Sequence, residues 1–399
     1  MATPSNVFLV TGAAGFLGKV VLEELLRQKD TLPVSSIILL IRPKQGETAR
    51  QGFDKTIASS LCFSALPEGW EKSVEVIDSE LALPRCGLAD ADFQHITETA
   101  THIIHAAGCV KFNSTLSEAL SSNTDGALNV VELARSCRRL HRIVTTSTAY
   151  VSHPGTPALA QLGPVGHPNV YSLSKCLAEH LIFERRGNLP VTIVRPSIIS
   201  AALRYPEPGW IDSRAAFAGL VLCFGKGILK VVNGRRDTQL DIIPVDEVAS
   251  CLIREIFQPV AFAEDPSPAR IAFSVTTSRY SLSINEICQL LQEFFHQIPE
   301  TGGRRFRFIG RGWLFKFNEA LHHSAPLTLH SVICRFKGRL ELRRQSDKAL
   351  KIVKAMNVAF SHYTRRTYEF QSEGPGEQFD PRQYITVACE GVRQHLMAG

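Results

Sequence analysis

The sequence contains no apolar run long enough to cross a membrane. Its longest apolar stretches, such as FAGLVLCF at 217–224, fall well short of the roughly 18 residues that a membrane-spanning helix needs. The first residues, MATPSNVFLVTG, also lack the cationic start, apolar core and small-residue cleavage site of a secretory signal. We therefore expect a cytoplasmic protein.

The cysteines form no pattern typical of a metal site or a disulfide framework. Ten cysteines are scattered through 399 residues, with no C-x-x-C pair and no cysteine–histidine cluster at ligand spacing. Free thiols in a reducing compartment are the simplest interpretation, and no structural metal is implied. The 44% hydrophobic and 21% charged content is that of a folded globular protein rather than a disordered chain.

Short β-branched runs alternate with amphipathic stretches over the first 200 residues. The runs are about five residues long and include NVFLV at 6–10, IILLI at 37–41 and VTIVRP at 191–196. Apolar strands that are each followed by a helix are typical of a parallel sheet covered on both faces. The sequence therefore predicts an α/β, doubly wound fold of the Rossmann type.

The pattern changes along the chain and suggests a division. Residues 1–275 are predicted to form the Rossmann domain, with an insertion at 199–238 that contains the Pro/Gly-rich segment RYPEPGWIDS. Beyond that, residues 276–399 are mostly helical in pattern. We expect them to form a C-terminal region that binds substrate or faces a membrane.

Three glycines separate the first predicted strand from the first helix. In VFLVTGAAGFLGKVV they are Gly12, Gly15 and Gly18. Such glycines permit a tight turn and close approach of the backbone to a pyrophosphate, which the helix N-terminus attracts. The segment therefore predicts a nucleotide site, although glycine-rich turns are common by themselves. The predicted cofactor contacts here are Thr11, Gly12, Ala14, Gly15, Phe16, Leu17 and Gly18.

The second predicted strand ends in a basic residue. Enzymes that use NAD usually place an acid here for the ribose 2′-hydroxyl, whereas an arginine accommodates a 2′-phosphate. In IILLIRPK this residue is Arg42, with Lys44 beside it and no acid in the segment. The sequence favours NADP(H), and a solvated basic loop is the alternative.

Tyr171 and Lys175 lie four residues apart in NVYSLSKCLAEHL. On a helix they share one face, and an ammonium near a phenol lowers the phenol pKa. Tyr171 would then exchange a proton with a substrate oxygen, and Lys175 would also bind the nicotinamide ribose. A coincidental pair on a surface helix is the alternative, because Y-x-x-x-K is a common spacing.

Two further strand ends supply small and hydroxyl residues. TTSTAYVS places Ser147 and Thr148 at the carboxyl edge of the sheet, where a hydroxyl can steady a carbonyl oxygen. We favour Thr148 for this role, because Ser147 could merely end a strand. HAAGCVKF contains small residues that would let a flat cofactor lie close. The predicted contacts from this segment are Ala106, Ala107, Gly108 and Lys111.

Taken together, these segments resemble the fatty acyl-CoA reductases, which belong to the extended short-chain dehydrogenase/reductases. The G-x-x-G-x-x-G spacing is similar to that superfamily, and PSIISAALRYPEPGWID at 196–212 is the most specific segment. Similarity continues into HYTRRTYEFQSE and FDPRQYITVACEGVRQHL. The resemblance implies that NADPH reduces a long-chain acyl-CoA thioester through the aldehyde to a primary alcohol.

The resemblance also implies roles for individual residues. Asn123 matches an asparagine that holds a proton-relay water near the lysine, although it could instead be satisfied by local backbone. The remaining cofactor contacts implied are Glu80, Leu81, Pro196, Ser197 and Ile198. The substrate contacts implied are Ser147, Thr148, Ser200 and Trp210. Two departures stand out: only about 20 residues separate TSTAYV from NVYSLSK, and Ser79-Glu80 replaces the usual Gly-Asp.

Other functions remain open at this point. An aldehyde-forming thioester reductase that acts on an acyl carrier protein, a fatty aldehyde reductase and a non-catalytic NADP-binding regulator share many of these features. The stretch 301–354 has 13 Lys and Arg against three acids. It could be a solvated face, a contact for CoA phosphates or an acidic carrier protein, or a peripheral membrane surface. No nucleic-acid motif is present.

Overall fold

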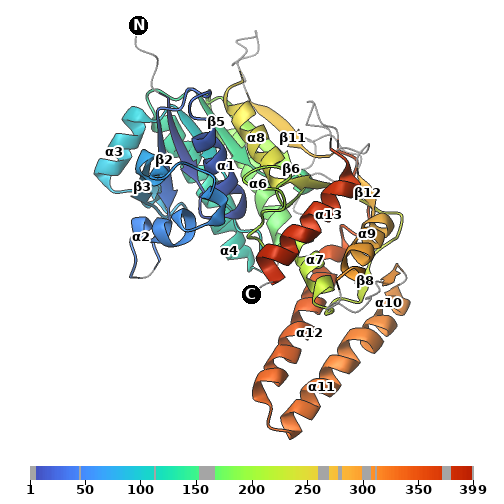
Figure 1. The fold of residues 1–399 in the computed structure, drawn as a ribbon. Helices are drawn as coiled ribbons and strands as arrows, with labels where there is room; N and C mark the ends of the chain where they lie inside the picture. The colour runs from blue at the N-terminus through green and yellow to red at the C-terminus, as the bar shows by residue number, and fades with distance from the viewer. Residues whose placement is uncertain are drawn as a thin grey trace.

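The fold is seen in a computed structural model of the chain (Figure 1). The structure describes residues 6–44, 46–111, 114–151, 167–258, 269–276, 281–298, 307–310, 312–370 and 379–397.

A seven-stranded parallel sheet forms the centre of the molecule. Its strands lie in the order β3-β2-β1-β4-β5-β6-β11, and every neighbouring pair runs parallel. The strands are β1 (Val7–Thr11), β2 (Ser36–Ile41), β3 (Val74–Asp78), β4 (His102–His105), β5 (Arg142–Thr146), β6 (Val191–Pro196) and β11 (Arg270–Ser274). The strand order reverses between β1 and β4, which creates the crevice where such sheets bind ligands. The predicted doubly wound fold is confirmed.

Helices cover both faces of this sheet, and β1 shows why its residues are uniformly apolar. Phe8 and Val10 pack into the core beneath two of the helices, whereas Leu9 points into the core on the opposite face. Because neither face of such a strand meets solvent, polar residues do not alternate with apolar ones along it. One face is covered by α1 (Phe16–Arg27) and α8 (Val245–Ile256), and the other by α3 (Asp90–Thr99), α5 (Gly126–Ser136) and α6 (Val170–Arg185).

A second hydrophobic core forms from segments that follow β6. It includes the fully buried aromatic side chains of Phe224, Phe295 and Tyr384. Both the predicted insertion and the C-terminal helices contribute to it, so the two pack as one body. Its elements are β7 (Ile198–Ser200), α7 (Ala216–Gly225), β9 (Gln239–Leu240), β10 (Ile242–Pro244), β12 (Leu282–Ser283), α9 (Ile284–His296) and α13 (Pro381–Val392). The division near residue 276 stays a prediction.

A helical hairpin projects from this second core (Figure 1). We call residues 312–361 the arm; its elements are α10 (Gly312–Glu319), the π-helical turn η8 (Ala320–Ser324), α11 (Ala325–Phe336) and α12 (Leu340–Ser361). Its base is held to β8 (Val231–Asn233). The buried Nε2 of His323 accepts the backbone N–H of Lys230 at 2.8 Å, and Nδ2 of Asn357 donates to the carbonyl of Val231. Among the helices described, none combines the length and apolar character needed to traverse a bilayer.

Candidate active site

The glycine turn between β1 and α1 leaves no room for side chains at two positions. Gly12 has φ of +79°, and a Cβ there would lie 2.5 Å from the backbone nitrogen of Ala107. A Cβ on Gly18 would lie 2.1 Å from the carbonyl oxygen of Gly12. Gly15 is the N-cap of α1, and no side chain of the described residues caps that helix. Its first-turn N–H groups can therefore bind an anion such as a pyrophosphate.

Arg42 and Glu80 meet at the carboxyl ends of β2 and β3. Nη1 of Arg42 lies 3.8 Å from Oε2 of Glu80, and the Arg42 side chain is 72% exposed. The sequence interpretation saw no acid near Arg42, because Glu80 comes from the next strand. An ion pair at this distance between exposed groups contributes little to the free energy of folding. It therefore does not immobilise the Arg42 guanidinium. Lys44, two residues after Arg42, is exposed. The carbonyl of Leu81, next to Glu80, accepts a hydrogen bond from Asn129 at 2.8 Å.

Three of the predicted catalytic side chains come together at the start of α6. Tyr171 lies in the first turn of this helix and is hydrogen-bonded to the side chain of Thr148. One turn later, Nζ of Lys175 donates to the carbonyl oxygen of Thr146 at 2.9 Å. Lys175 therefore lies on the same face of α6 as Tyr171, and its ammonium bonds the end of β5, two residues before Thr148.

Burial dominates the proton affinities of this group. Burial lowers the pKa of Lys175 to about 8, opposed by the charge of Glu179. Burial raises the pKa of Tyr171, and the hydrogen bond with Thr148 acts in the other direction. The sequence interpretation had Lys175 lowering the Tyr171 pKa, whereas in the structure burial is the larger influence and raises it. At neutral pH Tyr171 is therefore a neutral phenol, which is the form that donates a proton.

Asn123 is held by hydrogen bonds to two other segments of the chain. Its Oδ1 accepts the N–H of Cys109 at 2.7 Å, and its Nδ2 donates to the Cys109 carbonyl at 3.1 Å and to Oγ of Ser174 at 2.9 Å. A Cβ on Gly108 would lie 3.0 Å from Nζ of Lys175 and 3.1 Å from Oδ1 of Asn123. The geometry therefore ties Asn123 to the segment after β4 and to α6, and keeps it near Lys175. Its part in a proton relay stays a prediction.

Just after the end of β6, Ser197 is bonded to a buried acid, Asp241, that the sequence analysis did not single out. Oγ of Ser197 donates to Oδ1 of Asp241 at 2.5 Å, and the same oxygen accepts the N–H of Thr276 at 2.9 Å. All three residues are buried. Asp241 lies within DIIPVDEVA, but only the folded chain reveals its partners. It fixes Ser197, which follows Pro196 and precedes Ile198 at the predicted nicotinamide wall.

The insertion packs against the helix that follows the glycine turn. Trp210 is buried and its ring stacks on Phe16, with centroids 5.5 Å apart. Nζ of Lys19 donates to Oδ2 of Asp212 at 2.5 Å. In this structure Trp210 therefore supports the glycine turn, and its predicted substrate contact stays a prediction. Ser200 is likewise buried, in β7.

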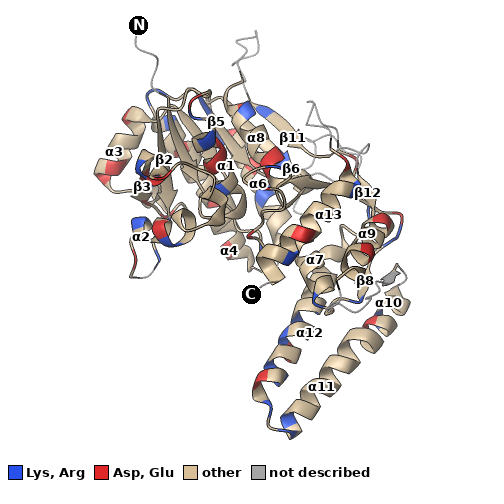
Figure 2. Ribbon diagram, in the orientation of Figure 1, with Lys and Arg blue, Asp and Glu red and all other residues tan. Residues whose placement is uncertain are grey.

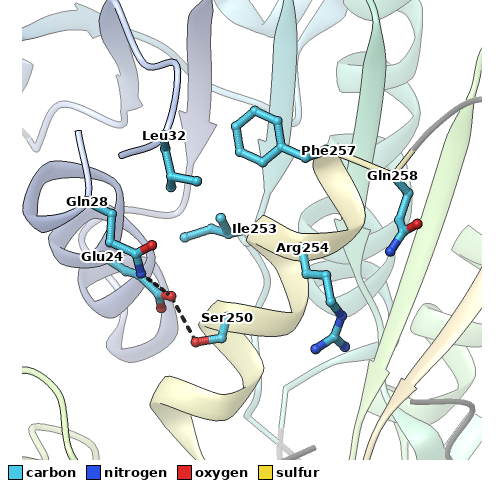
Figure 3. A pocket seen from close by; sticks show the side chains of 8 residues that line it. All are labelled: Glu24, Gln28, Leu32, Ser250, Ile253, Arg254, Phe257 and Gln258. Atoms are coloured by element: carbon cyan, nitrogen blue, oxygen red, sulfur yellow. Dashed lines mark hydrogen bonds between the residues drawn. The ribbon is translucent and has the colours of Figure 1, made fainter. Parts of the chain in front are cut away.

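A groove of about 440 Å³ lies elsewhere on the molecule, between α1 and α8 (Figure 3). The buried carboxylate of Glu24 accepts hydrogen bonds there from Gln28 and Ser250. Burial raises the pKa of Glu24 to about 7. Because α1 and α8 cover the face of the sheet opposite α6, this groove is separate from the cluster around Tyr171.

Known proteins of one family are similar to the whole of this chain. The family model described as male sterility protein matches residues 10–252. Fatty acyl-CoA reductase wat of Drosophila melanogaster is 31% identical over 402 residues, which cover 92% of this chain and 76% of that protein. Fatty acyl-CoA reductase 1 of Homo sapiens is 29% identical, with 98% of this chain and 84% of the relative covered.

This chain belongs to the fatty acyl-CoA reductase family. The predicted resemblance is confirmed, and with it a nicotinamide-dependent oxidoreductase. Two solved structures share the fold. The terminal R domain from the myxalamid PKS-NRPS pathway has a TM-score of 0.71 at 21% identity. The match covers 99% of this chain and 92% of that domain's chain. The reductase domain of a nonribosomal peptide synthetase from Mycobacterium tuberculosis has a TM-score of 0.64 at 18% identity. That match covers 99% of this chain and 95% of the reductase domain's chain.

Proposed function

We propose that this chain reduces a long-chain acyl-CoA thioester with NADPH, through the aldehyde, to a primary alcohol and CoA. The observation that carries the proposal is the hydrogen-bonded pair of Thr148 and Tyr171 beside the buried Lys175. The names of the relatives support the thioester substrate.

The residues present fit a dinucleotide. A Cβ at Gly12 or Gly18 would fill the space beside the turn, so these glycines leave room for a pyrophosphate. The N-terminus of α1 suits the same anion. Bound NADPH would supply the hydride for each of the two reductions. Lys175 and the small turn at Gly108 would hold the nicotinamide ribose.

The protein side chains would manage the charge and the proton. Hydroxyls of Thr148 and Tyr171 would donate hydrogen bonds to the carbonyl oxygen as it becomes an oxyanion. Expulsion of the CoA thiolate, which takes a proton from solvent, would leave the aldehyde. In the second reduction Tyr171 would give its proton to the alkoxide oxygen and form the alcohol. Release of the aldehyde before this step is the alternative outcome.

Product analysis tests the reaction directly. The protein is incubated with NADPH and acyl-CoAs of increasing length, and products are identified by mass. Two NADPH oxidised per CoA released indicate the alcohol, whereas one indicates the aldehyde. Turnover of a free aldehyde without turnover of any thioester would show that the thioester assignment is wrong.

Tyr171→Phe removes the proposed proton donor. Loss of general acid catalysis should lower kcat by about 10² to 10⁴ while NADPH affinity, measured by fluorescence titration, changes little. Tyr205→Phe, at an exposed position in the insertion, is the matched control and should keep full activity. Retained turnover in Tyr171→Phe would refute the assigned donor.

The reaction rate should fall as pH rises through about 8. Burial lowers the pKa of Lys175 to about 8, so its ammonium is present below that pH and lost above it. The pH dependence of kcat/KM reports groups of the unliganded enzyme, so its alkaline limb should lie near this value. Lys175→Arg keeps a cation over that range and should lose this limb, even though its absolute rate is lower. A flat wild-type profile between about pH 7 and 9 contradicts the expectation.

Cofactor preference depends in our proposal on Arg42. A guanidinium hydrogen-bonded to a 2′-phosphate contributes about 1.5–3 kcal/mol. Arg42→Ala should therefore raise KM for NADPH roughly 10- to 100-fold and leave KM for NADH nearly unchanged. Lys29→Ala, an exposed cation just beyond α1, serves as control. Equal losses for the two cofactors would remove Arg42 from this role.

We further propose that the arm lies on an anionic membrane surface. It carries nine Lys and Arg against three acids, and Figure 2 shows the basic residues along α12 and at the turn before it. Its most exposed aromatic side chains are Phe336 (85%) and Trp313 (69%). Apolar side chains among cations suit an anionic interface. The exposed apolar residues of the arm are Trp313, Phe317, Leu321, Leu329, Val332, Ile333, Phe336, Leu340, Leu342 and Val358.

Vesicle flotation tests the arm. The protein should float with anionic vesicles at low salt and release as salt rises, because the attraction is partly electrostatic. The double variant Trp313→Ser with Phe336→Ser should float several-fold less. Leu61→Ser, an exposed leucine on the Rossmann domain, should behave like the wild type. Equal recovery with anionic and neutral vesicles, or none with either, contradicts the proposal.

A further inference from the structure

Tyr363, which lies just beyond the end of α12, contacts the residue that caps α6. Helix α12 spans 22 residues, a length of about 33 Å. One of its ends carries the exposed tip of the arm. Its other end leads into Tyr363, which is buried and near enough to Tyr171 to affect its pKa. This tyrosine therefore links the C-terminal region to the start of α6.

A two-step hydrogen-bond chain joins Tyr363 to the first turn of α6. Nδ2 of Asn169 donates to the hydroxyl of Tyr363 at 2.9 Å. Oδ1 of the same side chain accepts the N–H of Ser172 at 2.9 Å, which makes Asn169 the N-cap of α6. An N-cap side chain sets where a helix begins. Tyr363 is therefore bonded to this cap, two residues before Tyr171.

Aromatic packing fixes the Tyr363 ring from the other side. The ring of Tyr150 meets it edge to face at 4.8 Å, and meets Tyr368 in the same manner at 5.0 Å. Tyr150 follows Thr148 by two residues, and its backbone N–H donates to the Thr148 hydroxyl at 3.3 Å. Tyr363 thus contacts the segments that carry both hydroxyls of the candidate site.

The backbone next to Tyr363 is tied to the second core. Oγ1 of Thr364 donates to the carbonyl of Asn233 at 2.5 Å, and the carbonyl of Thr364 accepts the N–H of Arg235 at 2.9 Å. Asn357, two turns earlier on α12, bonds to the same strand β8. Tyr363 therefore has a rigid support that is independent of α6.

We infer that Tyr363 is a positioning residue for Tyr171, acting through Asn169. This inference rests on the proposed function, since it takes Tyr171 as the proton donor. Tyr363 itself contacts Asn169 and would not touch the reacting atoms. Its hydroxyl keeps the Asn169 amide oriented, the amide keeps the first turn of α6 in place, and that turn holds the Tyr171 hydroxyl against Thr148.

Tyr363→Phe tests the inference, because it removes the hydroxyl and keeps the ring. Loss of one buried hydrogen bond should lower kcat roughly three- to tenfold, with KM for NADPH unchanged. Amide hydrogen exchange at residues 170–173 should become faster at the same time. Tyr368→Phe is the matched control, because its hydroxyl bonds to His362 and not to α6. It should alter neither readout.

A second variant examines the same link from the other side. Asn169→Ser keeps an N-cap hydroxyl for Ser172 but is too short to reach Tyr363. It should reproduce the kinetic effect of Tyr363→Phe, and the double variant should be no slower than either single one, because all three break one interaction. Additive losses would overturn the link.

The two readouts separate this inference from the proposed function. Unchanged exchange at residues 170–173 in Tyr363→Phe overturns the inference whether or not the enzyme is active. Faster exchange with unchanged kcat also overturns it. If neither an acyl-CoA nor an aldehyde makes the wild type oxidise NADPH, the proposed function fails. Amide hydrogen exchange alone then decides whether Tyr363 orders the start of α6.

Discussion

The close approach of backbone at Gly12 is the constraint on which the rest of the structure depends. The chain leaving β1 turns in the narrow space beside Ala106 and Ala107, where a single additional carbon would overlap with the backbone. Gly18 lets α1 begin directly on this turn. The N-terminus of the helix therefore lies at the crevice between β1 and β4, and Phe16 and Lys19 in its first turn contact the insertion.

A series of contacts carries this placement to the C-terminal region. The backbone of Gly209 touches α13 at Gly391, where a Cβ would lie 1.8 Å from the Gly209 carbonyl oxygen. The hydroxyl of Tyr384 on the same helix donates to the carbonyl of Ala201. Since α13 shares its core with α7 and α9, the insertion and the C-terminal helices pack together. The body that anchors the arm is thus built onto the dinucleotide-binding half.

The parts that sequence reasoning found are local in the chain. The apolar strands, the glycine spacing and the one-turn spacing of Tyr171 and Lys175 each depend on a few consecutive residues, whose periodicity is visible without a fold. The pKa of Tyr171 was misjudged because burial is not visible in a spacing. The partners of Arg42 and Ser197 were missed because they come from other segments: Glu80 follows β3, and Asp241 lies between β9 and β10, outside the central sheet.

The sequence by itself determined the doubly wound fold, the glycine turn and the family, because these depend on short-range pattern and on short segments that can be recognised without a fold. Only the tertiary structure decided which groups share one environment. It buried Lys175, placed Trp210 on Phe16, and brought Tyr363 from the far end of the chain to the cap of α6. Such contacts join residues far apart in sequence, and their desolvation depends on the whole packed molecule.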